Sequence, residues 1–164
     1  MQFAELKPKH TREDLKGEAF LPDLSCLGYS DFRDVYEPNE DTYLLIDALS
    51  LEIKEFGQNK MSVLEVGVGS GAVITSVALL MQKNGNKDSM FIGTDINPLA
   101  IACAQRVAEI NQVDIKFVET KFADRLDEQF DVLIFNPPYV VTSEEELADA
   151  QDKKGIAAAW AGGL

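Results

Sequence analysis

Residues 131–141 have the sequence DVLIFNPPYVV, and this stretch decides the fold that the sequence predicts. An uninterrupted apolar run ends abruptly at Asn136 and two prolines. This pattern is typical of a buried parallel strand that delivers a polar side chain to the carboxyl edge of an α/β sheet. Ligands bind at that edge in such folds. The stretch therefore predicts an α/β fold with a ligand site beside Asn136.

The corner after this strand has the chemistry to hold a planar NH2 group. Proline donates no backbone N–H group, so the local carbonyls are not used in a strand ladder. Asn136 then offers its side-chain carbonyl beside the backbone carbonyl of Pro137, and Tyr139 can stack on the plane of the bound group. We expect Asn136, Pro137 and Tyr139 to be catalytic, with Pro138 completing the substrate-binding set. The competing interpretation is a strand that two prolines end for purely structural reasons.

Strands and helices alternate along the rest of the chain. From apolar periodicity and capping residues we predict strands at 61–66, 90–95, 115–119 and 131–135, and helices over about 42–53, 72–81 and 97–110. This order predicts an open parallel sheet with right-handed crossovers. Residues 142–146 are predicted to form a solvated loop or a helix start. Residues 1–30 are predicted to be a partly disordered N-terminal extension to a domain over 31–164.

A glycine-rich turn, GVGSG, directly follows the first predicted strand. Such a turn lets the backbone approach a ligand closely, but it serves nicotinamide, flavin and S-adenosylmethionine sites alike. A carboxylate beside the glycines, Glu65, would repel a pyrophosphate and attract the sulfonium and α-amino groups of S-adenosylmethionine. Asp95 ends the second predicted strand, where an acid binds ribose hydroxyls. We therefore expect Gly67, Gly69, Glu65 and Asp95 to bind this cofactor. The plainer interpretation is an ordinary connection in which Glu65 is incidental.

Methyl transfer from sulfur to nitrogen fits these two expected sites. The reaction is an in-line displacement, for which positioning and electrostatics supply most of the catalysis. Two carbonyl acceptors aimed at the hydrogens of an amide or exocyclic amine favour the positive charge that builds there in the transition state. No metal is needed. The same corner also suits a flipped-out adenine, so a nucleic-acid adenine N6-methyltransferase is the alternative function.

The composition argues against that alternative. The 164 residues carry a formal net charge of -13, the wrong sign for direct binding to nucleic acid, so a protein partner is favoured. Cys26 and Cys103 lie far apart without C-x-x-C spacing, which predicts reduced thiols and no zinc site. No apolar run reaches the length of about 18 residues that a membrane span needs. We expect no membrane association and a cytoplasmic location, with the nucleus as a second location.

Four motifs resemble, in order and spacing, those of the HemK-like N5-glutamine methyltransferases: YEPNEDT at 36–42, LEVGVGSG at 64–71, GTDINP at 93–98 and NPPYV at 136–140. The closing AAWAGG at 158–163 is similar to the eukaryotic branch, which methylates the glutamine of the Gly-Gly-Gln motif in the class I translation release factor. The resemblance implies the Rossmann-like fold of class I S-adenosylmethionine-dependent methyltransferases. Family members continue for three more strands. The sequence is therefore expected to be a C-terminally truncated form of this fold, with 131–135 at an exposed apolar edge.

The resemblance also implies roles for individual residues and for partners. The residues implied to contact S-adenosylmethionine are Thr42, Glu65, Gly67, Asp95 and Asn136, and those implied to hold the glutamine are Asn136 to Tyr139. Phe122 is implied to pack on the adenine. A small zinc-binding activator subunit is implied to form a heterodimer with the chain near its third strand, and protein lysine is implied as a further substrate. A non-catalytic truncated isoform is the remaining alternative.

Overall fold

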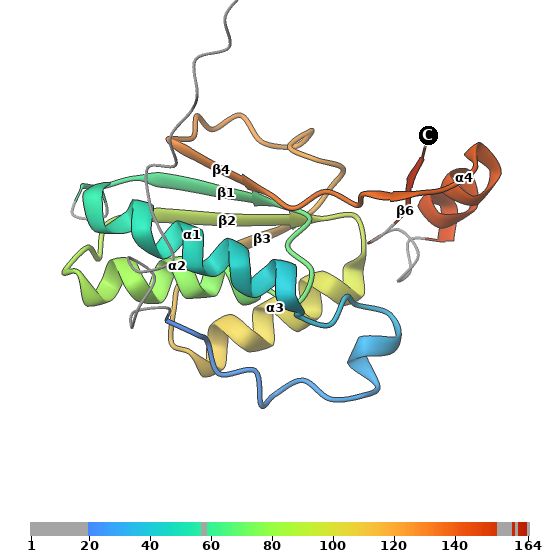
Figure 1. Ribbon diagram of the computed structural model, residues 1–164. Coiled ribbons are helices and arrows are strands. Elements are labelled where there is room, and N and C mark those ends of the chain that lie inside the picture. Colours follow the sequence, from blue (N-terminus) through green and yellow to red (C-terminus); the bar gives the residue numbers. More distant parts are fainter. Residues whose placement is uncertain (1–19, 57–58, 154–158, 160, 164) are drawn as a thin grey trace, which may run out of the picture.

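The strand β1 (Ser62–Val66) lies at the centre of a parallel sheet, between β2 (Met90–Asp95) and β4 (Val132–Phe135). β3 (Lys116–Glu119) pairs with the other side of β2, so the strand order is β3-β2-β1-β4 (Figure 1). The computed structural model describes residues 20–56, 59–153, 159 and 161–163. The predicted α/β parallel sheet is confirmed, and each strand begins within one residue of its predicted start.

Three helices cover one face of this sheet, as Figure 1 shows: α1 (Glu40–Phe56), α2 (Ala72–Lys83) and α3 (Pro98–Ile110). Apolar side chains of the three helices and of the strands form one core on this face, and α1 packs against α2. α3 begins at the predicted cap, where the Asn97 side chain accepts a hydrogen bond from the Leu99 N–H at 3.0 Å. The core on this face contains residues from all three helices and from the strands: Ile46, Ile53, Val63, Ile74, Met81, Phe91, Ala104 and Ile134.

The opposite face of the sheet is only partly covered. Residues 120–131 pack there against Leu64, Val66 and Ile92, and the apolar hollow beside them has a volume of about 410 Å³. β4 borders this hollow, with Leu133 65% exposed and Phe135 43% exposed. The interpretation of 131–135 as a buried strand is therefore wrong for the side chains on this face, while the expected exposed apolar edge is confirmed. The physical reason is that no described strand pairs with the outer side of β4, and α1, α2 and α3 lie on the other face of the sheet (Figure 1).

Three short elements follow the corner after β4: β5 (Val140–Val141), α4 (Glu144–Lys153) and β6 (Ala161–Gly163). Of the two alternatives predicted for 142–146, a solvated loop or a helix start, the structure shows the helix start, which is α4. Its cap is reciprocal, because the Ser143 hydroxyl oxygen accepts a hydrogen bond from the Glu146 N–H and the Glu146 carboxylate accepts one from the Ser143 N–H. The parallel pairing of β5 with β6 was not predicted. Trp160, which belongs to the AAWAGG motif, lies outside the described residues.

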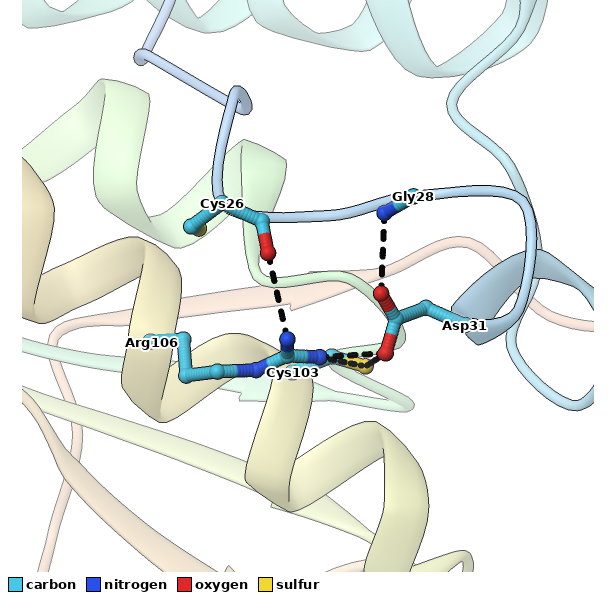
Figure 2. Close-up of polar contacts among 5 residues, drawn as sticks. All are labelled: Cys26, Gly28, Asp31, Cys103 and Arg106. Atoms are coloured by element: carbon cyan, nitrogen blue, oxygen red, sulfur yellow. Dashed lines mark hydrogen bonds and ion pairs between the residues drawn. The ribbon is translucent and has the colours of Figure 1, made fainter.

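The segment before α1 is fastened to α3 (Figure 2). Arg106 of α3 forms an ion pair with Asp31 and donates a hydrogen bond to the carbonyl of Cys26 at 3.1 Å. The N–H of Gly28 donates to the other oxygen of Asp31 at 2.8 Å, just before the short 3-10 helix η1 (Asp31–Arg33). This part of the predicted extension therefore packs on the domain. Residues 1–19, which make up most of the predicted extension, lie outside the described residues.

Gly71 offers a test of how closely α2 and α3 pack. Its φ is +82°, and a Cβ at this position would lie 2.8 Å from the Cα of Ala104 in α3. We expect Gly71→Ala to lower the free energy of unfolding by about 3 kcal/mol, through backbone strain and overlap with α3. Gly85→Ala is the matched control, because Gly85 has φ +85° but open space around it, and its cost should be about 1 kcal/mol. Urea unfolding measures both, and equal losses would contradict the close helix packing.

Candidate functional site

The register of the sheet aligns the carboxyl ends of β2, β1 and β4. Val66 of β1 is paired with Thr94 of β2 and with Phe135 of β4, and the next residues along the three strands are Asp95, Gly67 and Asn136. Because neighbouring strands lie about 4.8 Å apart, the row from Asp95 across β1 to Asn136 spans roughly 10 Å. The structure therefore brings the predicted acid, the glycine turn and the predicted corner together at one edge.

The glycine turn has the backbone conformation that glycine allows. Gly67 and Gly69 have φ values of +71° and +52°, in the left-handed region. The N–H groups of Gly67 and Val68 donate hydrogen bonds to the carbonyl of Thr94 at 2.8 and 2.9 Å, which fixes the turn to β2. A Cβ at Gly67 or Gly69 would have no atom within 4 Å, so the space beside both glycines is open.

Asp95 is oriented by backbone N–H groups. Its two oxygens accept hydrogen bonds from the N–H of Gly69 at 3.0 Å and from the N–H of Asn97 at 2.9 Å. Burial raises the pKa of Asp95 above its ordinary value, although these N–H donors oppose the rise. The Asn97 side chain also donates to the carbonyl of Asp34 at 2.8 Å, so the segment before α1 supports the same corner. A carboxylate held in this way has oxygens positioned to accept hydrogen bonds from a diol.

Glu65 lies in the interior, with 4% of its surface exposed. Its Oε2 accepts a hydrogen bond from the N–H of Ile74, in the first turn of α2, at 2.9 Å. Burial raises the pKa of Glu65 to about 8, and the neighbouring Asp95 adds to the rise. An opposite charge nearby favours the ionised form of such a group. Glu65 is therefore uncharged at neutral pH unless a cation lies beside it, and its contact with a cationic ligand stays a prediction.

A carboxylate joins the first turn of α1 to the corner after β4. The Nδ2 of Asn136 and the hydroxyl of Tyr139 both donate hydrogen bonds to Oδ2 of Asp41, each at 3.1 Å. The hydroxyl of Tyr36 donates to Oδ1 of Asp41 at 3.1 Å. Sequence reasoning missed Asp41, because the helix dipole alone explains an acidic residue in a first turn. The predicted Asn136 and Tyr139 thus lie together, each with its polar group on this carboxylate.

β6 supports the other side of the corner. A Cβ on Gly162 would lie 2.9 Å from the carbonyl oxygen of Pro138 and 3.1 Å from the backbone of Tyr139. Only glycine allows β6 to approach this closely. Pro137 and Tyr139 are exposed, Tyr139 by 65%, so the corner is accessible to a substrate.

Two further residues predicted to bind the cofactor take different positions. Thr42 is buried in the first turn of α1, where its Oγ1 accepts a hydrogen bond from the N–H of Asn39 at 3.4 Å. Phe122 is 52% exposed and lines the apolar hollow. Its ring meets that of Phe135 edge to face, with the centroids 6.2 Å apart. Thr42 is therefore next to Asp41 and Phe122 is next to β4, and their contacts with the cofactor stay predictions.

Within the described parts of the chain, no group of three or more His, Cys, Asp or Glu side chains could hold a metal ion. Cys26 and Cys103 are free thiols, as predicted. Among the described helices, none is long and apolar enough to cross a membrane. The candidate site is thus built from carboxylates, an amide and backbone groups.

The sequence is similar to known methyltransferases. The family described as Methyltransferase small domain matches residues 37–155. Methyltransferase HEMK2 of Homo sapiens is 42% identical over 154 residues, which cover 91% of this chain and 68% of that protein. The eRF1 methyltransferase catalytic subunit mtq2 of Schizosaccharomyces pombe is 37% identical over 155 residues, which cover 87% of this chain and 65% of that protein. The chain thus spans about two thirds of the length of these curated relatives.

A solved structure shares the fold. The T. thermophilus 16S rRNA N2 G1207 methyltransferase (RsmC), in complex with AdoMet and guanosine, superposes with a TM-score of 0.55 at 20% sequence identity. The superposition covers 71% of this chain and 31% of that chain. The predicted Rossmann-like class I methyltransferase fold is confirmed by this likeness together with the observed strand order.

The raised pKa of Glu65 predicts a specific dependence of stability on pH. In the unfolded chain a Glu ionises near pH 4.5, whereas in the folded chain Glu65 keeps its proton up to about pH 8. Between these values the folded state binds more protons, so this group makes the free energy of unfolding fall as pH rises, by on the order of 3 kcal/mol from pH 5 to pH 8. Glu65→Gln removes this titration, so the free energy of unfolding of the variant should lack this fall between pH 5 and pH 8. Denaturant unfolding at both pH values measures the difference, and parallel pH profiles for the two proteins would contradict it.

Proposed function

The chain belongs to the methyltransferase small domain family, and we propose that it transfers the methyl group of S-adenosylmethionine to the side-chain nitrogen of a glutamine. The observation that carries this proposal is the alignment of Asp95, Gly67 and Asn136 at the carboxyl ends of adjacent strands. This row offers a carboxylate and an open backbone turn to a nucleoside at one end. At the other end it offers carbonyl acceptors to an NH2 group.

The residues at the first end fit S-adenosylmethionine. Glu65, a buried carboxyl whose pKa of about 8 lets it ionise next to a cation, complements the sulfonium and the α-amino group. The oriented carboxylate of Asp95 accepts hydrogen bonds from the ribose hydroxyls. The turn at Gly67 and Gly69 lies against the methionyl portion. Thr42 contributes from α1, and Phe122 packs on the adenine.

The residues at the second end hold and activate the substrate. S-adenosylmethionine, when bound, supplies an electrophilic methyl group. Asn136 Oδ1 and the Pro137 carbonyl accept hydrogen bonds from the glutamine NH2 group, which directs the nitrogen lone pair and stabilises the positive charge that develops on it. Tyr139 stacks on the amide plane, and Pro138 shapes the wall beside it. Positioning and electrostatics therefore supply the catalysis.

The substrate that we propose is the glutamine of the Gly-Gly-Gln motif in the class I translation release factor. A relative that is 37% identical is named an eRF1 methyltransferase catalytic subunit, and this name supports the substrate class. The net charge of -13 suits a protein substrate better than a nucleic acid. Protein lysine is a second substrate of the same proposed activity, because its amine also presents N–H donors to the two carbonyls.

The partner that we propose is a small zinc-binding activator subunit. The exposed edge of the sheet at β3 supports this proposal, because no described strand pairs with the outer side of β3. An edge strand of this kind is a ready site for pairing with another chain. The proposed location is the cytoplasm, where the release factor acts, and the nucleus for the lysine reaction.

Methyl transfer from radiolabelled S-adenosylmethionine tests the proposed function. The chain, co-expressed with the zinc-binding subunit, is expected to label purified release factor but not a factor whose Gly-Gly-Gln glutamine is replaced by alanine. Asn136→Ala should slow the transfer by roughly a hundredfold, because one of the two acceptors is lost. Labelling of adenine in DNA would favour the alternative function. A folded complex that binds S-adenosylmethionine but labels no substrate would contradict the proposed catalysis.

A further inference from the structure

Asp41 is the point where α1 and the corner after β4 meet, and its carboxylate is fully engaged there. Oδ2 accepts from the Nδ2 of Asn136 and from the hydroxyl of Tyr139. Oδ1 accepts from the hydroxyl of Tyr36 at 3.1 Å and from the N–H of Thr42 at 2.9 Å. An ionised carboxylate has about four lone-pair sites, so these four donors fill them.

We propose that Asp41 is a positioning residue that fixes the side-chain amide of Asn136, so that its Nδ2 faces Asp41 and its Oδ1 faces the substrate nitrogen. This inference rests on the proposed methyl transfer and deepens it. An ionised carboxylate only accepts hydrogen bonds, so the half of the Asn136 amide that faces Asp41 must be the NH2 group. The carbonyl half is then turned away from Asp41 and is the part left for a ligand.

Asp41 is held in the ionised state that this role requires. Burial raises its pKa, but the hydrogen bonds from Asn136, Thr42, Tyr139 and Tyr36 outweigh burial and keep the pKa of Asp41 below its ordinary value. Its place in the first turn of α1 adds the favourable end of the helix dipole. The acceptor state of Asp41 therefore persists at neutral pH.

The saturated carboxylate has two consequences for the reaction. First, Asp41 has no lone pair left to take a proton from the substrate, so it does not act as a general base. In the transfer, the nitrogen forms a bond to the methyl carbon, the carbon–sulfur bond breaks to leave a neutral thioether, and the N–H proton leaves to water. Second, the site presents acceptors alone to the nucleophile. It therefore selects amides and amines, which have N–H groups to donate, over carboxylates. A carboxylate has no hydrogen to donate to Asn136 Oδ1.

The contact also links elements that are distant in sequence. Asn136 and Asp41 are 95 residues apart, and Tyr139 and Asp41 are 98 residues apart. By themselves, β4 and the exposed corner would not hold the amide of Asn136 in one orientation, because the amide can rotate about the Cβ–Cγ single bond. The first turn of α1 supplies that restraint.

The test compares Asp41→Asn with the neighbouring charge change Glu40→Gln. Glu40 is exposed in the same turn of α1 and has the same charge, so it is the matched control. In the complex with the zinc-binding subunit, Asp41→Asn is expected to lower kcat for glutamine methylation by about a hundredfold, while the Kd for S-adenosylmethionine stays within about threefold. Glu40→Gln should change neither quantity. Unchanged kcat in Asp41→Asn, or an equal loss of cofactor binding, would overturn the positioning role.

A reciprocal exchange adds a readout that a purely structural role would not move. In Asp41→Asn combined with Asn136→Asp, the NH2 group sits on residue 41 and an acceptor oxygen again faces the substrate. The kcat of this double variant is expected to be at least about tenfold higher than that of Asp41→Asn, since the acceptor is restored. No recovery in a folded double variant would overturn the proposal. Tyr36→Phe removes only one of the donors to Asp41 and should lower kcat by about threefold to tenfold. This variant takes the place of Asp41→Asn if Asp41→Asn does not fold.

Nuclear magnetic resonance separates failure of this inference from failure of the proposed function. In the wild-type chain labelled with nitrogen-15, the Asn136 side-chain NH2 should give two well-separated proton signals with slow solvent exchange, because one proton is bound to Asp41. Asp41→Asn should remove this signature and Glu40→Gln should keep it, whether or not any methyl acceptor is found. The same signature in wild type and in Asp41→Asn would overturn the inference, even if the wild-type enzyme methylates glutamine.

Discussion

Parallel pairing of β1 with β2 on one side and with β4 on the other is the constraint on which the whole site depends. The shared register brings Asp95, Gly67 and Asn136 to one edge, although they come from three separate parts of the chain. A slip of one residue in either pairing would turn every side chain of that strand to the opposite face. The buried rows prevent this, because Val63 and Ile134 face the three helices while Leu64 faces the other side.

The second constraint is the placing of carboxylates in a protein that is already acidic. Each of the three at this edge is bound by backbone N–H groups: Glu65 by Ile74, Asp95 by Gly69 and Asn97, and Asp41 by Thr42. The environments separate their protonation states, because burial raises the pKa of Glu65 and of Asp95 whereas hydrogen bonds lower that of Asp41. The proposed cofactor site can therefore gain negative charge as a cation binds, while Asp41 is charged throughout.

The sequence predicted the layout of the sheet and missed what joins its parts. Strand and helix positions followed from local signals, namely apolar runs, the glycine turn and the Asn97 cap. The hydrogen bond between Asp41 and Asn136 has no local signal in the sequence. The two residues are 95 positions apart, and they meet only because α1 packs beside the corner after β4. The cap of α4 was readable, because Ser143 and Glu146 have capping-box spacing. The packing of the segment before α1 was missed because it depends on an ion pair between Arg106 and Asp31. Apolar periodicity does not reveal which charged residues pair.

The proposed methyl transfer depends above all on the four described strands assembling a binding site for S-adenosylmethionine. Calorimetric titration of this compound into the folded chain, alone and with the zinc-binding subunit, measures it directly. Asp95→Ala removes the carboxylate at the carboxyl end of β2, and Asp88→Ala is the control because Asp88 precedes the opposite end of the same strand. We expect the wild type and Asp88→Ala to bind S-adenosylmethionine, and Asp95→Ala not to bind it. A folded wild-type chain that binds nothing in either form, or an Asp95→Ala chain that binds as the wild type does, would contradict it.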